Sequence, residues 1–180
     1  MGEVVAFDYP YMREGRKRPD PLPQLVAAHG KAFDALANTH DGPIFLVGKS
    51  MGGRIGCHLA PRRPAAGLVC LGYPLCGAGD RQKLRDQALI DLRTPIMFVQ
   101  GTRDKLCPLD LLEEVRAKMT APSRLHVVEG GDHSLMASKT ALKAQGRTQA
   151  DVDAEIAQAI AAFVEELGRA PSSLAEKGAG

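Results

Sequence analysis

The chain has 180 residues, of which 44% are hydrophobic and 24% charged, and its 23 Lys and Arg residues nearly balance 21 Asp and Glu residues. This composition is typical of a soluble globular protein and excludes a chain that is disordered throughout. A net charge of +2 and an aromatic content of 4% without Trp argue against binding to nucleic acid or to a membrane surface. The four cysteines form no CxxC pair, so we expect reduced thiols, no zinc or other cofactor, and a cytoplasmic location.

Short apolar runs alternate with helical patterns along the chain. The first run, residues 4–7, predicts a strand that is buried on both faces. The basic, proline-rich residues 13–23 predict a solvated surface loop, with a nuclear-import signal as the alternative. The later elements are expected in this order: helix 22–37, strand 44–47, helix 51–59, strand 66–71, strand 96–99, helix 109–119, strand 125–128 and helix 152–167.

Strands separated by helices in this way predict the α/β fold class. We expect a mainly parallel sheet covered on both faces, that is, a three-layer αβα sandwich. Residues 1–168 would form a single domain, and the polar residues 169–180 a disordered tail.

Function is expected where the strands end, because ligands bind at the carboxyl edge of a parallel sheet. Residues 48–52 follow one strand and read G-K-S-M-G, a G-x-S-x-G motif between a strand and a helix. The glycines permit a sharp turn that projects the Ser50 hydroxyl from the sheet. The alternative is a glycine-rich turn with a buried serine. A phosphate-binding Walker A loop is excluded, because it would need a glycine at Pro43.

Two further polar residues follow later strands. Asp104 comes shortly after strand 96–99, and His133 lies in the loop after strand 125–128. Each alone would be an ordinary loop residue. The order Ser50, Asp104, His133 at successive strand ends is, however, the order of nucleophile, acid and base in α/β-hydrolases. Asp132 is a second candidate for the acid, and we prefer Asp104 because neighbours in a chain seldom point at each other.

Several of these segments resemble the dienelactone-hydrolase-like branch of the α/β-hydrolase superfamily: residues 48–54, 71–74, 94–95, 100–104 and 131–134. Within it they are similar to a group that includes the hydrolase-like domain of subunit three of the non-specific lethal chromatin complex. The resemblance runs from about residue 4 to residue 167. It implies Ser50 as nucleophile, Asp104 as orienting acid, His133 as general base and the Met51 backbone amide as an oxyanion donor. The implied reaction is hydrolysis of a small-molecule ester or thioester through an acyl-enzyme.

The N-terminus departs from the pattern of that family. The hairpin, strand and helix that usually open the fold are absent here, as is the loop, usually His-Gly, that supplies a second oxyanion donor. His29-Gly30 is not its equivalent, because it lies within helix 22–37. We therefore expect either a gap in the sheet between strands 4–7 and 44–47 or direct pairing of the two strands. Direct pairing would leave an exposed apolar surface that favours self-association or a protein partner.

The missing segments leave the choice between enzyme and binding module open. The loss of one oxyanion donor would lower turnover by about 10²–10³-fold. A weak or inactive hydrolase-like module that acts in protein–protein interaction is thus the alternative to an enzyme. A truncated product, in which Met1 is not the true start, is the third alternative.

Overall fold

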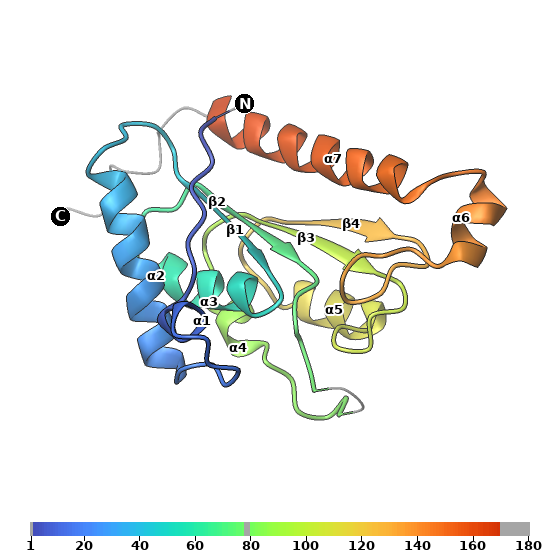
Figure 1. Cartoon of the computed structure of the whole chain (residues 1–180), viewed down its shortest axis with the longest axis horizontal. Coiled ribbons are helices and arrows are strands. Elements are labelled where there is room, and N and C mark those ends of the chain that lie inside the picture. The colour runs from blue at the N-terminus through green and yellow to red at the C-terminus, as the bar shows by residue number, and fades with distance from the viewer. Residues whose placement is uncertain (1, 78–79, 170–180) are drawn as a thin grey trace.

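The computed structural model describes residues 2–77 and 80–169 of the chain. Its centre is a parallel sheet of four strands, ordered as they occur in the sequence (Figure 1): β1 (Phe45–Lys49), β2 (Gly67–Leu71), β3 (Ile96–Gly101) and β4 (Ser123–Val128). Every crossover therefore moves one position in the same direction along the sheet.

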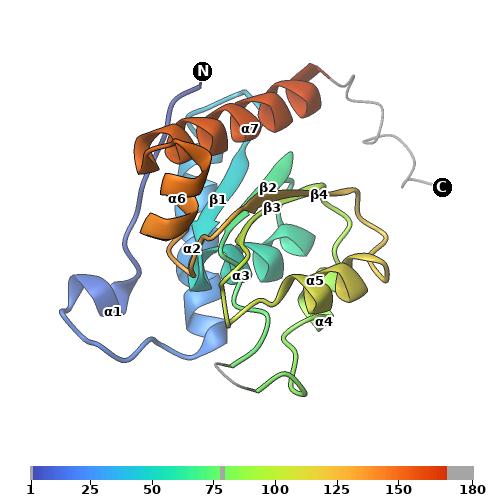
Figure 2. The same cartoon turned by 90° about the vertical axis from the view of Figure 1, so that its right-hand side faces the viewer.

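Helices cover both faces of this sheet (Figures 1 and 2), which confirms the α/β, three-layer prediction. α3 (Met51–Leu59) lies against one face, with α2 (Leu22–Ala37), α4 (Gln87–Ile90) and α5 (Leu109–Arg116) on the same side. α7 (Gln149–Arg169) crosses the opposite face over β2, β3 and β4. The shorter helices are α1 (Pro10–Arg13), the 3-10 turn η1 (Ala60–Arg62) and α6 (Lys139–Gln145).

The register of the sheet aligns the ends of its strands. Lys49 lies opposite Leu71, Leu71 opposite Val99, and Gly101 opposite Val128. The loops that leave the four strands therefore start at one edge of the sheet, the edge at which ligands bind in parallel α/β folds.

Burial explains why the two central strands are continuous apolar runs. All six residues of β3 and the first four of β2 are buried, since helices cover both of their faces. The outer strands β1 and β4 are less buried: Val47 on β1 is 55% exposed and Val127 on β4 is 44% exposed.

The prediction of a strand at residues 4–7 is wrong. Residues 2–9 have no regular secondary structure, β1 is the edge of the sheet, and Val4 is 86% exposed. The segment runs beside α2 instead, and the ring centroids of Phe7 and His29 lie 5.0 Å apart. An apolar run forms a strand of a sheet where a neighbouring strand accepts it. Among the described residues no strand other than β2 pairs with β1, so neither the expected gap in the sheet nor the direct pairing of residues 4–7 with β1 is found.

The other expected elements are confirmed, with two helices at the predicted limits, 22–37 and 51–59. Helix 109–119 ends earlier, at Arg116, and the last helix continues to Arg169. Within the described parts of the chain no helix is long and apolar enough to cross a membrane. Of the predicted tail, residues 169–180, Arg169 belongs to α7, and residues 170–180 lie outside the described residues.

Candidate functional site

Ser50 occupies the tight turn between β1 and α3, with φ 51° and ψ −119°. This is a strained conformation for a residue with a side chain. The turn is so tight that a Cβ on Gly48 would lie 2.3 Å from the nitrogen of Gly53, and a Cβ on Gly53 would lie 2.8 Å from the oxygen of Gly48. The two glycines thus let the strand and the helix meet, and the serine hydroxyl projects at the edge of the sheet.

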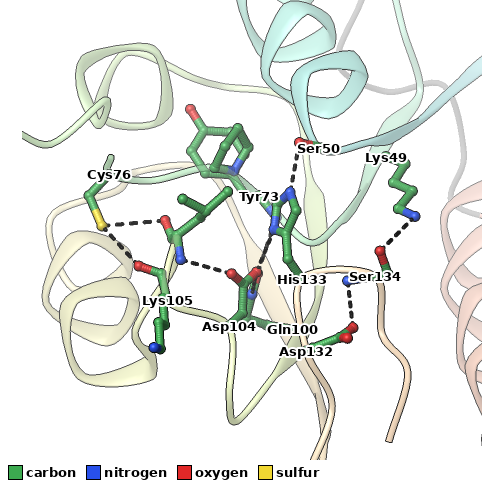
Figure 3. A network of polar contacts seen from close by, with 12 residues as sticks. Lys49, Ser50, Tyr73, Cys76, Gln100, Asp104, Lys105, Asp132, His133 and Ser134 are labelled. Carbon is green, nitrogen blue, oxygen red and sulfur yellow. Dashed lines mark hydrogen bonds and ion pairs between the residues drawn. The ribbon is translucent and has the colours of Figure 1, made fainter. Parts of the chain in front are cut away.

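The structure brings together the three residues that the sequence placed at strand ends (Figure 3). Nε2 of His133 lies 2.8 Å from Oγ of Ser50, and Nδ1 of His133 lies 2.8 Å from Oδ2 of Asp104. A carboxylate can only accept hydrogen bonds, so Nδ1–H of a neutral imidazole donates to Asp104. Nε2 is then left to accept the proton of the Ser50 hydroxyl.

Asp104 is held by three donors in the interior of the protein. Its side chain has no exposed surface. The backbone N–H of Leu106 donates to Oδ1 at 2.8 Å, whereas Nε2 of Gln100 donates to Oδ2 at 2.6 Å, beside His133. Gln100 was not predicted to be a site residue from the sequence. The available signal was a lone amide side chain directly after the apolar residues 96–99.

Asp132, the second candidate acid, shapes the loop that carries the histidine. Its Oδ1 accepts the backbone N–H groups of Ser134 at 2.8 Å and Met136 at 3.1 Å. This is the local turn geometry typical of aspartate. Of the two candidate acids, Asp104 is thus the one in contact with the imidazole.

Side chains from β1 and α7 also hold this loop. Nζ of Lys49 donates to Oγ of Ser134 at 3.3 Å. At the start of α7, the Gln149 amide donates to the oxygen of Leu135 at 3.2 Å and accepts the N–H of Ala137 at 2.9 Å. Contacts on both sides therefore fix the position of His133.

Gly72, which follows β2, leaves the space that His133 and Asp104 occupy. Its φ is +63°, and a Cβ there would lie 2.7 Å from the backbone oxygen of His133 and 3.7 Å from Oδ2 of Asp104. A side chain at this position would displace the pair.

Met51 begins α3, and its N–H is one of the first-turn amides that have no partner within the helix. None of the backbone acceptors in the described chain takes this amide, so it is available to an oxyanion beside Ser50. His29 and Gly30 lie within α2, as expected. Nδ1 of His29 is 3.2 Å from the Tyr9 hydroxyl, and burial lowers the pKa of His29 to about 4.

The surroundings of the site are open. Ser50 is partly exposed, and 29% of the His133 side chain is exposed. Two surface hollows lie elsewhere, one along α6 and one between α2 and η1. Residues 2–77 and 80–169 contain no group of three or more His, Cys, Asp or Glu residues arranged to hold a metal ion.

The cysteines behave as small buried residues. All four are free and buried. The Sγ atoms of Cys57 and Cys70 lie 3.9 Å apart, and their hydrogen bond together with burial raises the pKa of Cys70 well above the ordinary range. The Cys70 thiol is therefore neutral and poorly nucleophilic.

A profile of the alpha/beta hydrolase domain matches residues 2–165. Among solved structures, an α/β serine hydrolase homologue from Coxiella burnetii superposes with a TM-score of 0.55 at 19% identity, over 66% of this chain and 54% of that chain. A protein from Klebsiella pneumoniae subsp. pneumoniae, proposed to be a dienelactone hydrolase, gives a TM-score of 0.53 at 23% identity, over 72% of this chain and 57% of that chain. A serine hydrolase from Cycloclasticus zankles gives a TM-score of 0.50 at 14% identity, over 66% of this chain and 67% of that chain.

At these identities the structures share a fold with this chain. The chain spans little more than half the length of the Coxiella and Klebsiella proteins, 54% and 57% respectively.

Proposed function

Because the chain belongs to the α/β-hydrolase family, we propose that it is a serine hydrolase with Ser50 as nucleophile, His133 as general base and Asp104 as orienting acid. The observation that carries the proposal is the pair of 2.8 Å hydrogen bonds that joins the three side chains in this order. A serine hydroxyl is activated when a base accepts its proton and a carboxylate both orients that base and stabilises its charged form.

The chemistry follows from these contacts. Nε2 of His133 takes the hydroxyl proton while Oγ of Ser50 attacks the substrate carbonyl, and the Met51 N–H stabilises the oxyanion that forms. The imidazolium returns the proton to the leaving alcohol or thiol, and an acyl-serine remains. His133 then deprotonates a water molecule that attacks the acyl group. The proton that His133 took from the water then passes to Oγ of Ser50 as the bond between Oγ and the acyl carbon breaks. The carboxylic acid is released and Ser50 is regenerated.

The proposed substrates are small-molecule esters or thioesters. The motifs at residues 48–54, 100–104 and 131–134 support a place in the dienelactone-hydrolase-like branch, to which they are similar. The likeness to the chromatin-complex subunit stays a prediction, as do the single domain over residues 1–168 and the cytoplasmic location.

A second candidate function is a weak or inactive interaction module. β1 has a free edge in the described sheet, and its Val47 is 55% exposed. In the N-terminal segment, Val4 and Val5 are 86% and 55% exposed. A protein partner or a second copy could cover this surface.

The first test is labelling of the purified chain with a fluorophosphonate, read out by intact mass, with the Ser50→Ala variant alongside. We expect one adduct per wild-type chain, none on the variant, and hydrolysis of p-nitrophenyl acetate only by the wild type. A folded chain that neither labels nor hydrolyses the ester would contradict the hydrolase proposal and favour the interaction module.

A further inference from the structure

We propose that Gln100 is a positioning residue of this site, whose buried amide fixes the Asp104 carboxylate in the orientation that accepts the hydrogen bond from His133. The inference rests on the proposed function, since it concerns how the same three residues are held together.

The hydrogen bonds of Gln100 determine which way its amide faces. Oε1 accepts the backbone N–H of Tyr73 at 3.1 Å, and Nε2 donates to Oδ2 of Asp104 at 2.6 Å. A backbone N–H can only donate, so the amide oxygen must face Tyr73 and the NH₂ group must face Asp104. The orientation is thus set by the backbone at the end of β2.

The burial of Gln100 makes this arrangement rigid. The side chain is 0% exposed, so no water competes for its amide. A buried amide without partners would be costly. Here one of its two partners is the backbone and the other is Asp104, which leaves the carboxylate no freedom to rotate away from His133.

Asp104 depends on such donors because it is buried without a permanently charged partner. Among the ion pairs of the described residues, Asp104 takes part only in the pair with His133. The charge of Asp104 also acts on the thiols of Cys76 and Cys107: it raises their pKa values, although burial is the larger cause in both. Neutral thiols offer no compensating charge, so the hydrogen bonds from Gln100 and Leu106 hold the carboxylate.

The chain of contacts also links three neighbouring strands. It runs from the backbone of Tyr73 after β2, through Gln100 on β3, to Asp104 and to His133 after β4. A displacement at Gln100 would therefore change the distance between the imidazole and Ser50, although Gln100 touches neither group.

The Gln100→Met variant keeps the volume of the side chain and removes both hydrogen bonds. With p-nitrophenyl acetate as probe, we expect kcat to fall by about 10–100-fold, the usual effect of a small misplacement of a catalytic group. KM should stay within about twofold, because the substrate does not contact Gln100. The rate of fluorophosphonate labelling should fall in proportion to kcat.

The Gln100→Glu variant separates positioning from packing. Glu keeps the acceptor for Tyr73 but sets a second carboxylate against Asp104, so the two share one proton at neutral pH and lose it as the pH rises. We expect kcat/KM of this variant to fall on the alkaline side of a pH profile in which the wild type stays level. A residue that only filled space would leave the profile unchanged.

Phe98→Leu is the matched control, since Phe98 lies two residues earlier on β3, on the same face, and is equally buried. It should lower the melting temperature and leave kcat and the pH profile unaltered. If both Gln100 variants fold and keep the wild-type kcat and the wild-type dependence of kcat/KM on pH, the inference is overturned. If Gln100→Met fails to fold, the pH profile of Gln100→Glu decides alone. A wild-type chain that neither labels nor turns over would instead remove the proposed function, and this inference with it.

Discussion

Ser50 and Leu135 are the non-glycine residues of the described chain with positive φ, 51° and 65°. One is the proposed nucleophile, and the other lies two residues after His133. Such conformations cost on the order of 1–3 kcal/mol each and persist only where the surrounding structure enforces them. Here the close approach of Gly48 and Gly53 enforces the first, and the hydrogen bond from Gln149 restrains the second. The strained backbone thus lies in the two segments that direct the side chains of Ser50 and His133 toward each other.

At the same scale, Gly72→Ala should impair the site. The new Cβ would meet the His133 oxygen at 2.7 Å while the backbone stays at φ +63°, so the imidazole must shift. We expect the labelling rate to fall about tenfold or more and the free energy of unfolding to fall by roughly 1–3 kcal/mol. Gly146→Ala is the matched control, because φ there is +62° and no atom lies within 4 Å of the new Cβ. Gly146→Ala should be less stable but should label at the wild-type rate. Equal labelling rates in the two variants would show that the contact between residue 72 and His133 does not affect the site.

The helices and strands that could be predicted from the sequence are those whose burial follows from the spacing of their own apolar residues. The continuous apolar runs of β2 and β3 and the periodic α7 were of this kind, and so was the order of Ser50, Asp104 and His133 at strand ends. Residues 4–7 have an equally apolar run, but its conformation depends on a neighbouring strand that the sequence does not specify. Gln100 could not be predicted for a similar reason, because its role comes from a contact with the backbone of Tyr73, which follows the neighbouring strand β2.

The packing of residues 2–9 on α2 gives the fold a pH-dependent stability through His29. Burial lowers the pKa of His29 to about 4, below its unfolded value of about 6.5. The unfolded chain therefore binds this proton more readily, so the stability is complete above about pH 6.5 and declines as the pH falls toward 4. Between pH 7.5 and 5 we expect a loss of roughly 2 kcal/mol in the free energy of unfolding.

Urea denaturation at the two pH values measures this loss. In His29→Gln the difference between the two pH values should shrink by about the same amount. His40→Gln, at an exposed position, should keep the wild-type difference. The same pH dependence in His29→Gln and in the wild type would assign the effect to other groups.

On the scale of the whole molecule, helices cover the faces of the sheet, and among the described residues no strand pairs with the outer side of β1. A parallel strand that is free on one side offers unpaired N–H and C=O groups to another chain, and the β1 residue Val47 is 55% exposed. The site and this edge are adjacent along the chain, since β1 ends one residue before Ser50. Pairing along β1 would thus act on the turn that carries the proposed nucleophile.

This edge leads us to expect self-association of the chain. Sedimentation velocity over a range of concentrations should show a larger species that grows with concentration. Val47→Lys places a charge on the exposed face of the edge strand, where charges oppose strand pairing and hydrophobic contact, and should weaken association about tenfold or more. Val127→Lys is the matched control on β4, the other edge strand, at a residue that is 44% exposed. It should associate like the wild type if the chains pair along β1 and not along β4. A wild-type chain that stays monomeric at every concentration would show that the edge of β1 does not pair with a second copy. A partner of another kind would then have to cover the exposed edge.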